Sequence, residues 1–465
     1  MPGLLTNLLR VLRDRRGTDM QFLCRHLLSS RGEASQTALA QEIIAAVSAM
    51  NFGERVKFFE MLSREFSADQ AAVLRAAAAY QLAPGPDTLS ALSAAVEAPR
   101  QELFRRINTA PHGTETLVAM RGDLIDLSSS RTDFGALDAD LKHLFRSWFN
   151  RGFLRLERIS WRTSALVLEK LIQYESVHEI NGWPDLQRRL RADRRCFAFF
   201  QSALADEPIT FVEVALTNQL SDNIEPLLDT TAPVLDPERM DTAICYSINN
   251  CLKGLRNVPF GNFLIKQVVT EIAAELPNIR TYGTLSPLPR FAEALRDRQN
   301  EQGFTGARLA RLLADYAKEL TAAAGGRDAI EAFFRLLKQP LAHREVLAAP
   351  LKRLAFAYLT KARGRGGKHY DPVATFHLSN GARVERVNAF GNLRPYGLEA
   401  SMGVTVNYRY LPAEFEENHE RFVRNGQIRV SNPLLAENRV VNAAWRGGSG
   451  NSSPEKELIE AVTHA

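Results

Sequence analysis

The sequence is poor in cysteine, with only Cys24, Cys196, Cys245 and Cys251 among 465 residues. They form no C-x-x-C pair and no Cys/His cluster with the spacing of a zinc site, so neither a zinc finger nor a dithiol redox motif is present. Four scattered cysteines are typical of free thiols in a reducing compartment. We therefore expect no disulfide framework and no bound metal.

Long apolar runs are also missing, since none approaches the roughly 18 residues that cross a bilayer. Residues 1–16 are mildly amphipathic and basic, but they lack the apolar stretch and cleavage site of a secretory signal. A mitochondrial presequence is not excluded, although Asp14 and the scarcity of serine disfavour it. The last residues are no peroxisomal address. The pattern predicts a cytoplasmic protein without a membrane partner.

The chain carries little excess charge, a net +5 from 58 basic and 53 acidic side chains. Nucleic-acid-binding domains concentrate Lys and Arg on one face, so this balance predicts no nucleic-acid partner but permits a small anionic ligand. The length predicts about two or three domains, and 45% hydrophobic residues are ordinary for a globular chain.

The first part of the chain has helical periodicity. Apolar residues recur at helical spacing over 39–50, namely Leu39, Ile43, Ile44, Val47 and Met50. Ser67 followed by Gln70 has the form of a capping box, with Ser67 as N-cap. The sequence PGPD at 84–87 breaks the chain, and Asp87 can cap the next helix. This part predicts an all-α bundle used for packing or self-association.

From about residue 151 strands and helices alternate, which predicts an α/β or α+β domain. The expected helices cover 263–276 and 301–362. The expected strands cover 208–217, 243–248, 279–286, 375–378, 383–388 and 404–411.

The turn at 253–262 lies between a predicted strand and a predicted helix. Its Arg256-x-x-Pro259-x-Gly261 core opens the helix, where backbone N–H groups and the helix dipole favour a phosphate group. By pattern alone, a plain turn with a helix cap is the other interpretation. The basic, Gly-rich tract at 361–369 resembles an RNA-binding segment but has no interleaved aromatic residues. We interpret it as a loop over the active face whose cations could meet a ligand phosphate.

Four polar residues end or occupy predicted strands in the second part. Ser286 is followed by Pro-Leu-Pro, which forces the chain out of a sheet and leaves the hydroxyl at the strand's exit. His377 lies in an apolar segment, where it is either a hydrogen-bonded core residue or a general acid. Tyr408 and Tyr410 alternate with Arg409 and so share a face. From the residues alone, structural roles for all of them stay open.

Several segments together resemble one known family. They are WFNRGFL at 148–154, VHEI at 177–180, RRCF at 194–197, FGNFLIK at 260–266, TLSPLP at 284–289 and NYRY at 407–410. In this order they are similar to malonyl-CoA decarboxylases. The resemblance implies an α-helical self-association domain at 1–147, giving a dimer or tetramer, and a catalytic domain at 148–465 that is similar to the GNAT acetyltransferase fold.

The resemblance also implies site residues. It places the catalytic serine on Ser286, the catalytic histidine on His377, a supporting tyrosine on Tyr410 and a functional lysine on Lys170. It identifies the turn as the loop that binds the CoA pyrophosphate, made of Arg256, Asn257, Val258, Pro259, Phe260, Gly261 and Asn262. Some relatives carry Glu where Pro259 stands, so any role of that carboxylate is absent here or supplied elsewhere.

The implied reaction converts malonyl-CoA to acetyl-CoA and CO2 through a thioester enolate that His377 protonates. It needs no metal or organic cofactor, because the thioester carbonyl accepts the electrons. The alternative is a GNAT-like acyltransferase, which would need an acceptor channel and a base. A third possibility is an acyl-CoA-binding regulator.

Overall fold

The computed structural model describes residues 20–30, 32–127, 133–258, 264–364, 367 and 369–446. Their contacts divide the chain into two compact units, which are described separately. The first unit contains the described residues of 1–179, 197–211 and 249–263, and the second contains those of 180–196, 212–248 and 264–465.

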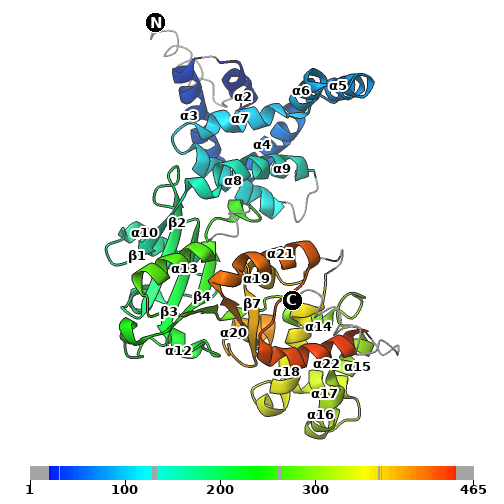
Figure 1. Ribbon diagram of the computed structural model, residues 1–465. Coiled ribbons are helices and arrows are strands. Elements are labelled where there is room, and N and C mark those ends of the chain that lie inside the picture. Colours follow the sequence, from blue (N-terminus) through cyan, green and yellow to red (C-terminus); the bar gives the residue numbers. More distant parts are fainter. Residues whose placement is uncertain are drawn as a thin grey trace. The chain divides into compact units, whose positions relative to one another are not determined.

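The first unit begins with a series of helices, as the periodicity predicts (Figure 1). Leu39, Ile43 and Val47 of α3 are buried in a core that α2, α7, α8 and α9 complete. The helices are α2 (Met20–Ser29), α3 (Glu33–Ala49), α4 (Phe52–Glu65), α5 (Gln70–Leu82), α6 (Pro86–Val96), α7 (Pro99–Asn108), α8 (Gly113–Leu127), α9 (Gly135–Trp148) and α10 (Ala165–Tyr174).

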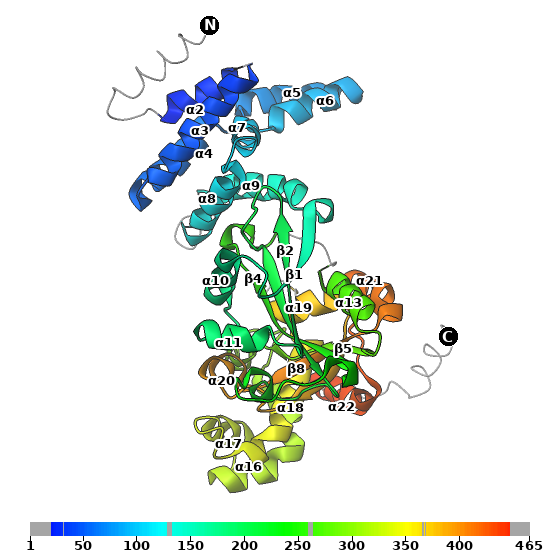
Figure 2. The ribbon, with the colours of Figure 1, turned by 90° about the vertical axis from the view of Figure 1, so that its left-hand side faces the viewer.

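Helices α5 and α6 form a hairpin, and both predicted caps in it are wrong (Figure 2). Asp69, not Ser67, is the N-cap of α5, since its carboxylate accepts the amides of Ala71 and Ala72. An ionised acceptor outcompetes a hydroxyl for these amides, and the Ser67 hydroxyl donates to the Ser63 carbonyl instead. Asp87 lies inside the first turn of α6, because Pro86 already occupies the first helical position.

Within the described residues, one mixed sheet contains all the strands, in the order β1-β2-β3-β4-β5-β8-β6, with β7 paired to β8. Strands β4 and β5 run parallel with α13 between them in sequence, whereas β8 is antiparallel to β5, β6 and β7. The strands are β1 (Leu154–Ile159), β2 (Arg194–Gln201), β3 (Thr210–Thr217), β4 (Thr242–Asn250), β5 (Thr281–Thr284), β6 (Ser286–Pro287), β7 (Arg383–Asn388) and β8 (Thr405–Tyr410).

The observed order confirms the predicted fold class, an all-α part followed by a mixed α/β part. The strands predicted at 208–217, 243–248, 383–388 and 404–411 are present with small changes at their ends. The strand predicted at 279–286 is divided by Leu285 into β5 and β6, and both pieces pair with β8. The strand–helix–strand crossover agrees with the expected GNAT-like class.

The strand predicted at 375–378 is wrong, because these residues lie in helix α19 (Pro372–Ser379). Asp371 caps this helix by accepting the amides of Val373 and Ala374, and Pro372 occupies the first helical position. A short apolar run does not distinguish a buried strand from a buried helix, and here the cap decides. His377 therefore lies on a helix.

The second unit also contains the helices predicted over 301–362, as α15 to α18 (Figures 1 and 2). None of the described helices is long and apolar enough to cross a membrane. The helices are α11 (Gly182–Arg189), α12 (Glu225–Leu228), α13 (Leu264–Glu275), α14 (Phe291–Arg296), α15 (Gly306–Leu313), α16 (Ala317–Ala324), α17 (Ala329–Leu336), α18 (Arg344–Thr360), α20 (Pro395–Ser401), α21 (Phe415–Asn425) and α22 (Leu435–Arg446).

The turn that follows β4 is anchored on α8 within the first unit. The Arg121 guanidinium donates to the carbonyls of Gly254 and Arg256, at 2.5 and 2.9 Å. A Cβ atom at Gly254 would lie 1.9 Å from the Val118 carbonyl oxygen, so only glycine allows this approach.

We expect Gly254→Ala to force the turn and α8 apart and to cost about 1–3 kcal/mol of unfolding free energy, as overpacking does. The melting temperature, measured by calorimetry, should fall accordingly. Gly135→Ala is the matched control, because a Cβ there meets nothing within 4 Å. Equal melting temperatures for the two variants would contradict this account of the turn.

Candidate active site

Ser286 lies in β6, opposite Val406 of β8. The side chain is buried, with 5% of its surface exposed. Its hydroxyl lies 2.9 Å from the Thr284 hydroxyl and 2.9 Å from Nε2 of His377. Thr284 and Ser286 are two residues apart, and both hydroxyls reach the same side of the chain.

His377 is fully enclosed on helix α19, and both of its ring nitrogens have partners. Nε2 contacts Ser286, and Nδ1 lies 2.7 Å from the Tyr410 hydroxyl. The imidazole also stacks on the Tyr408 ring, with centroids 4.6 Å apart. The two tyrosines of β8 therefore share a face, as predicted, and this face holds the histidine.

One set of proton positions satisfies these contacts together. The Tyr410 hydroxyl donates to Nδ1 of His377, Nε2–H donates to the Ser286 oxygen, and the Ser286 hydroxyl donates to Thr284 Oγ1. Thr284 Oγ1 in turn accepts the Tyr408 amide at 3.2 Å. The donors thus run from Tyr410 through His377 and Ser286 to Thr284, whose oxygen also accepts from the sheet backbone.

Burial keeps the members of this chain uncharged. It lowers the pKa of His377 to about 3, so the imidazole is neutral at pH 7. It raises the pKa of Tyr410 well above its ordinary value, so the phenol is protonated in the resting site. A neutral imidazole with a proton on Nε2 can donate a hydrogen bond, but it carries no positive charge toward a substrate.

Asp371 supports the histidine from the start of α19. Besides the two amides of the cap, its carboxylate accepts the Tyr358 hydroxyl at 2.9 Å. Burial raises the pKa of Asp371 to about 6. Thr284, Tyr358 and Asp371 were not identified from the sequence. The Asp-Pro pair at 371–372 is a helix-start signal that could have indicated the cap, and the two-residue spacing on a strand could have indicated Thr284.

Lys170 lies on α10 in the first unit, whereas Ser286, His377 and Tyr410 belong to the second. Its amine forms an ion pair with Glu207 and donates to the Asp206 carbonyl at 3.1 Å. Glu207 also accepts the Tyr174 hydroxyl. Lys170 lines a cavity of about 400 Å³ in that unit, together with residues 202–207. The structure thus brings together three of the predicted residues and gives Lys170 separate partners.

The predicted phosphate loop is described only at its start. Arg256 follows the short helix Lys253–Leu255, Asn257 has a positive φ of 61°, and Val258 is buried. Pro259, Phe260, Gly261 and Asn262 lie outside the described residues. Among the described residues, no group of three or more His, Cys, Asp or Glu side chains could hold a metal ion.

Family models match two stretches of the chain. The malonyl-CoA decarboxylase C-terminal domain matches residues 152–446, and the malonyl-CoA decarboxylase N-terminal domain matches residues 66–149. Mitochondrial malonyl-CoA decarboxylase of Anser anser anser is 33% identical over 363 residues, covering 72% of this chain and 68% of that protein. The Mus musculus protein is 33% identical over 344 residues, covering 72% and 70%.

Solved structures agree with these matches. The crystal structure of malonyl-CoA decarboxylase from Rhodopseudomonas palustris aligns with a TM-score of 0.79 and 41% identity, covering 90% of this chain and 98% of that one. The enzyme from Agrobacterium vitis aligns with a TM-score of 0.75 and 43% identity, covering 90% and 99%. The domain models, the relatives and the structures agree, and the chain belongs to the malonyl-CoA decarboxylase family.

Proposed function

We propose that this protein is a carboxy-lyase that converts malonyl-CoA to acetyl-CoA and CO2 at Ser286 and His377. The observation that carries the proposal is the buried hydrogen-bonded chain of Ser286, His377 and Tyr410 in a member of this family. The residues come from β6, α19 and β8, and they form one proton-conducting unit at the exit of a strand.

The reaction needs a proton and a place for two electrons. When the malonyl carboxylate leaves as CO2, the electron pair of the broken C–C bond moves into the thioester carbonyl and forms an enolate. A proton added to the α-carbon then returns the electrons and gives acetyl-CoA. Because the carbonyl accepts the electrons, we propose that no metal and no organic cofactor takes part.

We assign separate roles to the two central residues. Ser286 hydrogen-bonds the malonyl group and holds its carboxylate out of the carbonyl plane, so that the breaking bond overlaps the π system. His377 supplies the proton from Nε2, which already points at Ser286. As that proton leaves, the Tyr410 proton moves to Nδ1, so the imidazole stays neutral. The negative charge of the lost carboxylate then rests on the Tyr410 oxygen until a proton from solvent restores the phenol.

The remaining predicted residues are the loop that binds CoA and Lys170, which lies apart from the Ser286–His377 pair. The loop from Arg256 to Asn262 receives the CoA pyrophosphate, with Asn257 in a left-handed conformation that turns the chain. Lys170 adds a positive charge to its own cavity, where Glu207 and Asp206 hold its amine.

We further propose that the protein self-associates through the α5–α6 hairpin and acts in the cytoplasm. No residue from 70 to 97 is buried, and Leu74, Leu82, Leu89 and Val96 are exposed by 49–88%. Two short helices with such exposed apolar faces gain little stability alone. A second copy with the same hairpin would cover them in a self-complementary dimer contact, from which a tetramer could be built.

The activity test uses purified protein and malonyl-CoA with nothing else added. We expect acetyl-CoA and CO2 to form in equal amounts, and EDTA to leave the rate unchanged, because no metal takes part. Product is measured by liquid chromatography. If malonyl-CoA is consumed only after an amine acceptor is added, and free CoA and the acylated amine form in place of acetyl-CoA, the protein is an acyltransferase. If no acyl-CoA is consumed under either condition, it is not an enzyme of this kind.

We expect His377→Asn to lower kcat by about 100-fold or more, the usual cost of losing a general acid, with little change in the KM for malonyl-CoA. Ser286→Ala should also slow decarboxylation, because the malonyl group loses its orienting hydroxyl. Steady-state kinetics measure both effects.

His143→Asn is the matched control for the histidine variant, because His143 is exposed on α9. Melting temperatures of all variants separate loss of chemistry from unfolding. A folded His377→Asn protein with wild-type turnover would rule out the assigned proton donor.

We expect Leu74→Glu combined with Leu89→Glu to reduce the native mass to that of a smaller assembly, because charges in a paired apolar face must be desolvated. Light scattering after gel filtration measures the mass. Gln81→Glu, an exposed polar site on the same helix, serves as the control. An unchanged mass for the double variant would exclude the hairpin as the interface.

A further inference from the structure

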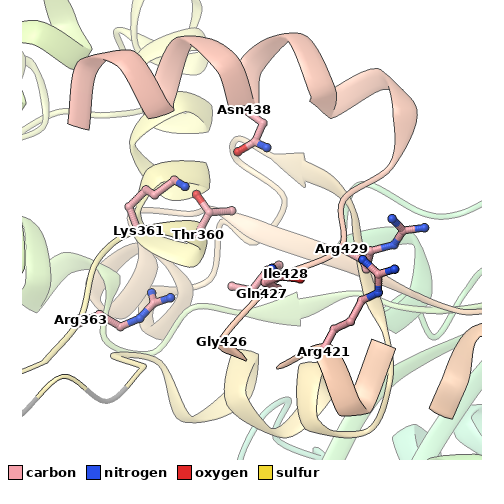
Figure 3. A pocket seen from close by; sticks show the side chains of 9 residues that line it. All are labelled: Thr360, Lys361, Arg363, Arg421, Gly426, Gln427, Ile428, Arg429 and Asn438. Atoms are coloured by element: carbon pink, nitrogen blue, oxygen red, sulfur yellow. The ribbon is translucent and has the colours of Figure 1, made fainter. Parts of the chain in front are cut away.

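A second cavity in the second unit has no role in the reaction above. It has a volume of about 530 Å³ and lies where the ends of α18 and α21 meet the side of α22 (Figure 3). None of its lining residues belongs to the Ser286–His377–Tyr410 chain. They are Thr360, Lys361, Arg363, Arg421, Gly426, Gln427, Ile428, Arg429 and Asn438.

Four of the nine lining residues are cations and none is acidic. Figure 3 shows Lys361 and Arg363 on one side of the cavity and Arg421 and Arg429 on the other. Arg421 has a carboxylate partner, Glu417, at 2.7 Å. For the other three cations, no ion pair exists within the described part of the chain.

The cations of the α18 end are also partly shielded from water. Lys361 and Arg363 are half-buried, and among the described residues the Arg363 side chain hydrogen-bonds only to the Ala362 carbonyl, at 2.9 Å. Burial, followed by the charges of Arg446 and Arg363, lowers the pKa of Lys361, and burial lowers that of Arg363. Holding positive charges together away from water destabilises the fold unless an anion compensates them.

The rest of the lining suits an oxyanion. The side chain of Asn438 accepts a hydrogen bond from Asn442 through its carbonyl oxygen, which leaves its amide group to donate. Gly426, with φ of 63°, ends α21 and turns the chain so that residues 427–429 form one wall. Guanidinium groups match phosphate oxygens in pairs, and an ammonium adds a compact charge.

We propose that this pocket, here called the α18–α21 pocket, binds a phosphate-bearing anion through Lys361, Arg363, Arg421 and Arg429. Several cations around one cavity require a ligand with more than one negative charge, and phosphate esters or pyrophosphates meet this requirement. The phosphate belongs either to the CoA part of the substrate or to a separate small molecule. Only the first case rests on the proposed function.

The pocket is connected to the histidine through α21. This helix carries Arg421 at one side of the pocket. Its His419 bonds the carbonyl of Ser379, the last residue of α19, and its Asn418 donates to the carbonyl of Gly381, just after α19. A ligand that draws Arg421 inward therefore acts on the helix that supports the end of α19. For this reason the test includes the reaction rate as well as binding.

The binding test compares the wild-type protein with the double variant Lys361→Gln/Arg363→Gln, using inorganic pyrophosphate as the probe at constant ionic strength. We expect pyrophosphate to raise the melting temperature of the wild type. Its affinity for the double variant should be at least about tenfold lower, because two charged contacts are lost. Without ligand, the double variant should melt at or above the wild-type temperature, since it loses uncompensated buried charge.

Arg424→Gln is the matched control, because Arg424 is an exposed arginine of α21 that pairs with Glu420 outside the pocket. It should keep the wild-type response to pyrophosphate. If the wild type shows no response, or if the double variant responds as the wild type does, the pocket is not an anion site. These outcomes do not depend on decarboxylase activity.

Kinetics with malonyl-CoA identify the source of the phosphate. A raised KM with unchanged kcat in the double variant, and inhibition of the wild type by adenosine 3′,5′-bisphosphate, would assign the pocket to the substrate's own phosphates. An unchanged KM, with a pyrophosphate effect on the rate that the double variant loses, would assign it to a separate ligand. Either result requires the binding described above.

Discussion

The hydrogen bond between the Ser286 hydroxyl and His377 is the contact on which the site depends. It joins two segments that are 91 residues apart in sequence. To make it, β6 must pair with β8 at Ser286, and α19 must begin where Asp371 can cap it. The stacked Tyr408 ring and the Tyr410 hydroxyl then fix the plane and the proton of the imidazole. Together these neighbours fix the position, the ring orientation and the tautomer of the histidine.

Local signals predicted much of the fold but not the surroundings of the site. The stripe at Leu39, Ile43 and Val47 and the strands around β3, β4, β7 and β8 follow from periodicity, and the structure contains them. Residues 375–378 were misassigned because an apolar run of that length suits a strand as well as a buried helix. The group that makes this segment a helix is the Asp371 carboxylate, which accepts hydrogen bonds from the amides of Val373 and Ala374. A hydrophobicity pattern does not contain this information.

The contacts between the candidate residues could not be predicted from local sequence patterns either. Ser286, His377 and Tyr410 were candidates from their sequence context, and the resemblance gave them catalytic roles, but each alone could have been a structural residue. Their contacts depend on the register of β8 against β5 and β6, which sequence patterns do not specify. Thr284 and Tyr358 were missed because a threonine in a strand and a tyrosine in a buried helix are ordinary in isolation. Their importance comes only from the partners that the fold provides.

Two buried titratable groups of this region, His377 and Asp371, have opposite effects on stability as the pH changes. Burial lowers the pKa of His377 from 6.5 to about 3, so the unfolded chain binds a proton that the folded chain does not, and stability falls as the pH falls through this window. Burial raises the pKa of Asp371 from 3.8 to about 6, so stability falls as the pH rises through that window. Near neutral pH, His377 is in the neutral form that the fold favours, whereas Asp371 is not in the protonated form that burial favours.

Helix α19 has only eight residues, about two turns, which is too short to be stable in isolation. It is held at its start by Asp371 and Tyr358 and after its end by α21, through Asn418 and His419. Strands of the sheet, in contrast, are tied by continuous ladders of backbone bonds. The segment that carries His377 therefore forms a local cooperative unit whose opening free energy is lower than that of the sheet. Partial opening of this segment removes the proton donor, while most backbone amides of the protein stay protected from hydrogen exchange.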